Sequence, residues 1–165
     1  MAPFRHALAI LALPIMVTVF VPLWIALAYA VHWQFPDSFA GSLAIAGGLA
    51  ALAGGLVLFV SCVLHFAAEE GTLAPWDPPR GLVVRGAYRY VRNPMISGVI
   101  FVLLGEALVL RSLPHLVWML VFTGINLVYI PLQEEPGLER RFGDAYQRYR
   151  ANVPRFVPRM SPWQG

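Results

Sequence analysis

Four long apolar runs alternate with polar stretches along the chain. The runs cover residues 7–31, 43–66, 95–110 and 115–132. An α-helix needs about 20 apolar residues to cross the hydrocarbon core of a bilayer. The pattern therefore predicts an all-α integral membrane protein with about four transmembrane helices, folded as a single membrane domain over residues 1–165. The polar stretches are a central loop, residues 67–94, and a C-terminal segment, residues 133–165.

The first run is too long for a secretory signal, whose apolar region spans roughly 7 to 15 residues. We therefore expect a retained helix, kinked at Pro22 because proline lacks the N–H that the helix needs. Trp33 and Phe35 follow the run. Aromatic rings of this kind favour the headgroup layer, so the chain leaves the membrane near these residues.

The second run carries small residues at a spacing of four. They form two neighbouring stripes, Gly47, Ala51 and Gly55 in one and Ala40, Ala44 and Gly48 in the other. Small side chains let a second helix approach closely, so the stripes predict a helix–helix contact. Cys62 lies in the same run, and we expect it to be a packing residue.

The central loop loses helical periodicity because prolines and glycines interrupt it. It carries four arginines, Arg80, Arg85, Arg89 and Arg92. Pro94 then begins the third helix, where its missing N–H needs no partner. Residues 111–114 turn the chain and the fourth run begins at His115, so the third and fourth helices form a tight hairpin.

The C-terminal segment combines an aromatic face with many arginines. Leu138, Phe142, Tyr146 and Tyr149 recur at helical spacing, while arginines occupy the other faces. This pattern predicts an interfacial helix on the membrane surface. We expect the segment to meet the central loop and to form the functional site with it.

Composition supports the membrane assignment. The chain is 58% hydrophobic and 13% charged, whereas about 25% of the residues of a soluble domain are charged. Twelve arginines supply all the Lys+Arg positions, and most lie in the central loop and after Glu135. The positive-inside rule places both termini and the central loop in the cytoplasm, in a bacterial inner membrane. Membrane lipids explain these arginines better than nucleic acid does, and the sequence does not indicate an oligomeric state.

Motifs for metal, nucleophile and phosphate-loop chemistry are missing from the sequence, and no metal site is predicted. Glu106 lies within the third run, where an ionisable group points to function unless it reaches water or forms a pair at the Arg111 end of the helix. The Glu134-Glu135 pair ends the fourth run. Its carboxylates are either solvated or bind a cationic ligand, and the residues alone leave both alternatives open.

Three motifs occur in a fixed order. L-V-V-R-G-A-Y-R-Y-V-R-N-P-M covers residues 82–95, E-E-P-x-L covers 134–138, and F-G-D-A-Y-Q-R-Y, followed by V-P-R, covers 142–155. Together they resemble the isoprenylcysteine carboxyl methyltransferase and phospholipid methyltransferase superfamily of integral membrane enzymes. The resemblance extends over about half of the chain.

This resemblance implies a methyltransferase that uses S-adenosylmethionine, bound on the cytoplasmic side. The implied donor-binding positions are Arg80, Gly81, Leu82, Val83, Tyr88, Arg92, Asn93, Pro94, Met95, Ile96, Glu134 and Glu135. No residue is implied as a catalytic base. The methyl acceptor would be a lipophilic molecule, such as a lipid or prenyl-type substrate with a carboxylate or an amine.

The chemistry of the donor suits these residues. Glu134 or Glu135 can bind its ammonium, and Tyr88 can offer a ring to adenine. The start of the third helix at Pro94 presents free N–H groups and a positive dipole end to its carboxylate. Methyl transfer then depends on positioning and on exclusion of water, without a protein nucleophile.

The sequence departs from the superfamily pattern at four positions. Arg80 and Asn93 stand in place of histidines, and Ile96 replaces a common tyrosine. Pro131 occupies the place of an arginine that carboxyl methyltransferases carry, which puts a prenylcysteine carboxylate substrate in doubt. Two alternatives therefore remain, an NADPH-dependent sterol-type reductase on a related membrane fold and a non-catalytic protein that keeps the scaffold.

Overall fold

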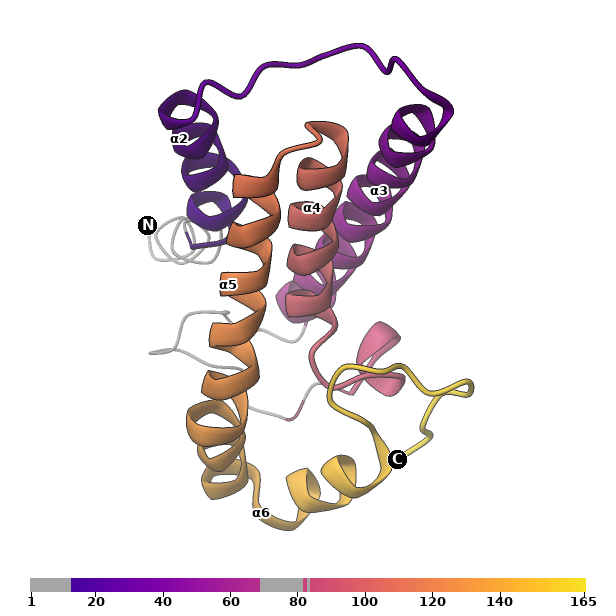
Figure 1. Cartoon of the computed structure of the whole chain (residues 1–165). Coiled ribbons are helices and arrows are strands. Elements are labelled where there is room, and N and C mark those ends of the chain that lie inside the picture. Colours follow the sequence, from indigo (N-terminus) through magenta and orange to yellow (C-terminus); the bar gives the residue numbers. More distant parts are fainter. Residues whose placement is uncertain (1–12, 69–81, 83) are drawn as a thin grey trace.

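The computed structural model describes residues 13–68, 82 and 84–165. Its elements, in chain order, are η1 (Met16–Phe20), α2 (Val21–Ala28), α3 (Phe39–Ala68), η2 (Gly86–Arg89), α4 (Pro94–Val109), α5 (Leu113–Tyr129), η3 (Ile130–Glu134) and α6 (Glu135–Asn152). In Figure 1, α2, α3, α4 and α5 run side by side, and α6 lies at one end. The predicted all-α membrane architecture is confirmed for the described residues.

Two helical stretches are long and apolar enough to cross a membrane, Phe39–His65 and Leu113–Asn152. Two further apolar helices are shorter, Leu13–Ala28 and Pro94–Val109. All four fall on the predicted runs. The N-terminal residues 1–12, where the first run begins, lie outside the described part of the chain.

Paired glycines bring α3 and α4 into close contact. Cβ atoms added at Gly55 or Gly98 would lie 2.7 Å and 3.0 Å from the carbonyl oxygen of the other glycine. Gly48 and Gly105 form a second such pair two turns away, where a Cβ on Gly105 would lie 2.7 Å from the Gly48 oxygen. The predicted small-residue contact is confirmed at Gly48 and Gly55. The prediction of a close contact is wrong at Gly47, because nothing lies within 4 Å of its Cβ position.

The first helix is irregular just before Pro22. The Val21 N–H bonds to the Met16 oxygen in a π-helical turn, which leaves the Val17 carbonyl free of the usual i−4 partner. Trp118 on α5 donates its Nε1–H to this Val17 oxygen at 3.1 Å. This π-helical turn, just before the Pro22 where the sequence predicted a kink, thus provides a polar link to α5.

A second polar link joins α2 and α5. His115 Nε2 lies 3.2 Å from the Pro22 carbonyl oxygen, and Nδ1 lies 2.8 Å from the Ser112 hydroxyl. A carbonyl only accepts, so Nε2 carries the proton and Nδ1 accepts from Ser112. Both partners of this buried ring are therefore satisfied.

The hairpin between α4 and α5 surrounds the main apolar core, Val99, Leu103, Met119 and Phe122. At its turn Arg111 has a positive φ of 48°. The Arg111 guanidinium bonds to Asp37 at 3.3 Å and to the carbonyl oxygens of Gln34 and Phe35. Arg111 therefore fixes the segment between α2 and α3 against the hairpin.

The fourth helix continues past its predicted end at residue 132. Pro131 and Pro136 lack N–H groups, and the chain adapts by a π-helical turn in which the Glu135 N–H bonds to the Ile130 oxygen. The helix bends instead inside α6, at Gly143, whose φ is 50° and ψ is −129°. Glycine tolerates this conformation because it has no Cβ. Figure 1 shows the bend beneath α5.

Candidate functional site

The described end of the central loop lies against the C-terminal segment, as the sequence predicted. Three backbone hydrogen bonds join the residues that the structure describes in these two stretches. The Arg92 N–H donates to Pro154 at 2.9 Å, the Arg159 N–H to Tyr90 at 3.0 Å, and the Trp163 N–H to Arg89 at 2.9 Å. The Arg89 side chain adds a bond from Nε to the Trp163 oxygen at 2.6 Å. The two polar stretches thus form one unit at the end of the helices.

An aromatic cluster fills the space between them. Tyr146, Tyr149 and Val153 are buried, and the residues packed against them are Leu82, Val84, Leu138, Phe142 and Trp163. The residues predicted to share a face of the C-terminal helix do pack together. Part of that face covers the central loop through Leu82 and Val84, which the prediction of a membrane-surface helix did not include. Leu82 thus has a packing role.

Glu135 is the electrostatic centre of this unit and is only 3% exposed. Arg155 donates to both of its oxygens, from Nε at 2.7 Å and from Nη2 at 2.8 Å. Arg92 Nη1 lies 2.9 Å away and Arg150 Nε 3.9 Å away. Burial alone would raise the pKa of Glu135, but the Arg155 hydrogen bonds and the charges of the three arginines hold that pKa below its usual value.

Because arginines occupy both Glu135 oxygens, this carboxylate is not open to a ligand ammonium in this structure. Its neighbour Glu134 is exposed at the surface. The surrounding protein still withdraws water from Glu134 and raises the pKa of its carboxyl, and the Glu135 charge raises it further. The adjacent glutamates therefore have different environments.

Tyr88 packs inward, with 9% of its surface exposed. Its carbonyl oxygen accepts from the Tyr149 hydroxyl at 2.7 Å, and its own side chain lies near Cys62 of α3. Burial, followed by Cys62, Tyr149 and the Glu134 charge, raises the pKa of Tyr88 well above its usual value. The ring predicted to meet adenine is thus mostly covered, although Glu134 is close enough to act on it electrostatically.

The start of α4 lies beside this unit. Asn93 is the N-cap residue, and its side chain makes no capping bond to the helix. Instead, Nδ2 donates to the Arg155 carbonyl oxygen at 3.3 Å. Pro94 is buried, and Ile96 packs against the α4–α5 core. Met95 is half-buried. Because the helix begins here, its first turn has backbone N–H groups without helical acceptors.

The structure thus brings together Leu82, Tyr88, Arg92, Asn93 and Glu135. Arg80, Gly81 and Val83 lie outside the described residues. Sequence reasoning assigned no role to Arg155, the main partner of Glu135. Arg155 lies in the V-P-R motif, but no pattern in the sequence indicates which acidic residue this arginine binds, because Glu135 is twenty residues away.

Glu106 lies on α4, away from this unit. Its Oε2 is buried and has no hydrogen-bond partner among the described residues. Among the described residues, the side-chain bonds of Arg111 go to Asp37 and to two carbonyls. The alternative in which Glu106 pairs with Arg111 therefore finds no support in this structure.

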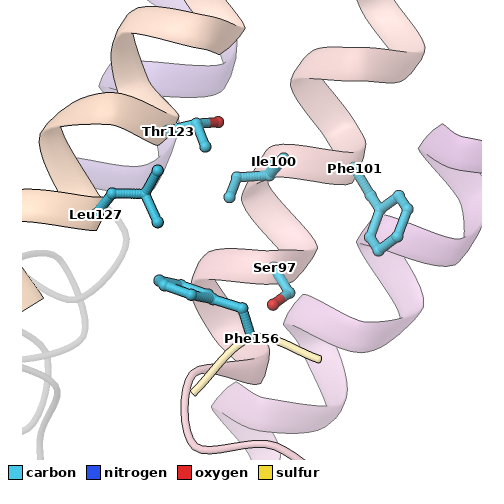
Figure 2. Close-up of a pocket in the computed structure, with 6 residues that line it drawn as sticks. All are labelled: Ser97, Ile100, Phe101, Thr123, Leu127 and Phe156. Atoms are coloured by element: carbon cyan, nitrogen blue, oxygen red, sulfur yellow. The ribbon is translucent and has the colours of Figure 1, made fainter. Parts of the chain in front are cut away.

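An apolar pocket of about 260 Å³ adjoins the start of α4. Ser97, Ile100 and Phe101 of α4, Thr123 and Leu127 of α5, and Phe156 of the C-terminal segment line it. Figure 2 shows the Phe156 ring between Leu127 and Ser97. Phe156, which lines the pocket, directly follows Arg155, which pairs with Glu135. The pocket therefore adjoins the Glu135 ion pairs through two consecutive residues.

Comparison with family models gives a match. The model described as phospholipid methyltransferase matches residues 43–145, more than half of the chain. The chain belongs to this family. The matched part of this phospholipid methyltransferase family member runs from α3 through Glu134, Glu135 and the Gly143 bend. Searches of curated proteins and of solved structures gave no match. Family membership and the apolar helices together support an integral membrane methyltransferase.

Proposed function

We propose that the protein transfers a methyl group from S-adenosylmethionine to a lipophilic acceptor at the cytoplasmic membrane face. The observation that carries the proposal is the unit formed by the central loop, the start of α4 and the C-terminal segment. It lies within a chain of the phospholipid methyltransferase family, and among the described residues Arg155 bonds Glu135 while the neighbouring Glu134 is exposed. S-adenosylmethionine supplies a methyl group made electrophilic by its sulfonium charge.

Four spans, at about residues 7–31, 43–66, 95–110 and 115–132, fit this proposal. The central loop 67–94 and the C-terminal segment 133–165 would both face the cytoplasm, together with the two termini. The arginine distribution supports this orientation in a bacterial inner membrane.

The donor fits the groups that the unit offers. Glu134, which is exposed and forms no ion pair with another described residue, would bind the ammonium. The free N–H groups of the first turn of α4, at Met95 and Ile96, would bind the carboxylate. Asn93 would hydrogen-bond from the N-cap position. Arg80, Gly81 and Val83 remain proposed contacts on the basis of the motif.

Glu135 has a positioning role in this proposal. Its bonds to Arg92 and Arg155 connect the central loop, α6 and the C-terminal segment. These bonds fix Asn93 and the start of α4 relative to Glu134. Tyr88 and Tyr149 support the same contact from inside, through the hydrogen bond at 2.7 Å.

The chain's residues would hold the acceptor in line with the methyl group and keep water out. A lone pair of the acceptor nitrogen or oxygen forms the new bond to carbon as the carbon–sulfur bond breaks, and sulfur keeps the bonding electrons as a neutral thioether. A primary or secondary amine then loses a proton to solvent, whereas a tertiary amine or a carboxylate loses none. Such positioning needs no covalent intermediate with the protein.

Titration of the purified protein with S-adenosylhomocysteine in a calorimeter tests the proposal. We expect binding to the wild type and at least tenfold weaker binding to Glu134→Gln, because one charge-assisted bond contributes about 1.5 to 3 kcal/mol. Glu139→Gln is the matched control, since Glu139 lies on α6, which directly follows Glu134, and among the described residues it pairs with Arg150 and Gln147. Equal binding to all three proteins would contradict the assigned role of Glu134. If none of the three proteins bound S-adenosylhomocysteine, the assignment of S-adenosylmethionine as the donor would be contradicted.

The raised pKa of Glu134 gives this binding a pH dependence. An ammonium prefers the ionised carboxylate, so binding weakens as the pH falls and Glu134 takes up a proton. Because the pKa is raised, we expect this loss to begin at a higher pH than for an ordinary glutamate. Calorimetry at several pH values should show that Glu134→Gln lacks this step. A step that persists in Glu134→Gln would belong to another group.

A further inference from the structure

The apolar pocket between α4 and α5 has no part in binding the donor as proposed above. It extends over the first two turns of α4, from Ser97 to Phe101. Phe156, which lines it, is joined through Arg155 to Asn93 and Glu135. The pocket therefore adjoins the polar unit and continues along the helices away from it.

The lining of the pocket suits hydrocarbon. Its two hydroxyls are both engaged with their own helices, because Ser97 donates to the Asn93 oxygen at 3.0 Å and Thr123 to the Met119 oxygen at 2.8 Å. The other lining side chains are aliphatic or aromatic. An occupant thus meets no hydrogen-bonding group that lacks a partner.

The pocket also reaches the surface of the helices that faces lipid. Phe101 is 48% exposed and Leu127 is 52% exposed. These two residues belong to α4 and α5, and exposed apolar residues such as Leu120 and Val128 continue along α5. A molecule dissolved in the bilayer can therefore enter from the side, without passing through water.

We propose that this pocket holds one hydrocarbon chain of the methyl acceptor, and that Phe156 determines which chains fit. The assignment of the chain to the acceptor rests on the proposed function. At about 260 Å³ the pocket is slightly smaller than a typical ligand site of roughly 300 to 1,000 Å³. It therefore accommodates part of one chain rather than two chains side by side.

Phe156 has the position of a specificity-determining residue. Its half-buried ring lines the pocket beside Leu127 and Ser97 (Figure 2), and the residue before it, Arg155, belongs to the polar unit, so we expect the acceptor's reactive end and its chain to meet near this ring. A chain in the bilayer is already in apolar surroundings, so the pocket orients the acceptor more than it attracts it. Removing the ring should widen the set of acceptors that react.

Photolabelling tests the occupant directly. A phosphatidylethanolamine with a diazirine in one acyl chain is added to the full-length protein in lipid nanodiscs, and labelled residues are mapped by mass spectrometry. We expect labelling of Ile100, Phe101 and Leu127 to be enriched over Val57, an exposed residue of α3. Leu127→Trp should reduce this enrichment several-fold. Val128→Trp should leave it unchanged, because Val128 is similarly exposed but does not line the pocket.

The chain profile of the reaction tests Phe156. Membranes containing Phe156→Ala should methylate acceptors of more varied chain length and bulk than wild-type membranes, with S-adenosylhomocysteine binding unchanged. Val157 is 76% exposed, and Val157→Ala should retain the wild-type profile. Equal labelling at Val57 and Phe101, or the same profile for Phe156→Ala and the wild type, would overturn the inference. If the wild type did not bind S-adenosylhomocysteine, the proposed function would be contradicted instead. The labelling pattern would still decide whether a hydrocarbon chain occupies the pocket.

Discussion

The adjacent carboxylates of Glu134, at the end of η3, and Glu135, at the start of α6, have different surroundings. Glu135 points inward to Arg92, Arg150 and Arg155, whereas Glu134 is exposed beside it. The separation follows from helix geometry, because consecutive residues on a helix point in directions about 100° apart. One carboxylate can therefore hold the site together while the other stays available to a ligand.

Replacing Glu135 should destabilise the protein. Glu135→Gln leaves three arginines without their buried counter-ion, and removal of one partner of a buried pair costs about 3 to 5 kcal/mol. We expect a clearly lower midpoint of thermal unfolding in detergent, followed by circular dichroism. The control Glu139→Gln breaks a pair that is about a third to a half exposed, so its effect should stay below about 1 kcal/mol. Similar midpoints for the two variants would contradict the central role of Glu135.

Acid should weaken the same contact. The folded-state pKa of Glu135 is depressed, so its contribution is complete above the unfolded-state pKa of about 4.3. The contribution is lost as the pH falls below that value and through the folded-state pKa. The difference in thermal midpoint between wild type and Glu135→Gln should therefore shrink on acidification. A difference that stays constant from neutral pH to pH values below the folded-state pKa would exclude this linkage.

At this scale the sequence identified the residue types better than their roles. Motifs pointed to Tyr88, Arg92, Asn93 and Glu135, and the structure brings these together. They did not indicate that Arg155 would occupy Glu135, because that bond depends on how the chain folds back after α6. Roles of long charged side chains depend on such tertiary contacts.

At the level of elements, the glycine pairs explain why α4 packs along α3. The sequence predicted a small-residue face on α3, and Gly48 and Gly55 confirm it. The partners Gly98 and Gly105 were not foreseen, although they have the same two-turn spacing. The bend at Gly143 was also missed, because Glu134, Glu135 and Pro136 look like the end of a helix. A π-helical turn accommodates the prolines and lets the helix continue.

The close contact of α3 and α4 predicts a sharp difference between neighbouring glycines. Gly55→Ala places a methyl carbon 2.7 Å from the Gly98 oxygen, so the helices must separate. We expect a loss of about 1 to 3 kcal/mol, typical of overpacking. Gly54→Ala meets nothing within 4 Å and should be neutral or slightly stabilising, since alanine favours helices. Thermal unfolding of the two variants provides the measurement, and equal midpoints would contradict the contact.

At the level of the whole molecule, the polar unit and the segment between α2 and α3 lie at opposite ends of the helices (Figure 1). This arrangement follows from the alternation of apolar runs and polar stretches, which is why the sequence predicted it well. Labelling of single cysteines in intact cells should show it. Cys62 is buried and should remain unlabelled.

We expect Gln34→Cys to react with a membrane-impermeant maleimide in intact cells, whereas Gln164→Cys should react only after the membrane is permeabilised. Both positions are exposed, so access to the reagent rather than burial determines the result. Reaction of both from the same side would contradict the four-span topology. The reverse pattern would keep the spans and invert the proposed orientation.

Transfer of a labelled methyl group tests the central claim most directly. Membrane vesicles containing the wild type or Glu134→Gln are incubated with S-adenosylmethionine labelled in its methyl group, and the lipid extract is counted. We predict label in the lipid extract of wild-type vesicles and a loss of at least about tenfold with Glu134→Gln. Wild-type vesicles that contain folded protein but transfer no more label than vesicles without it would contradict the proposed methyltransferase activity.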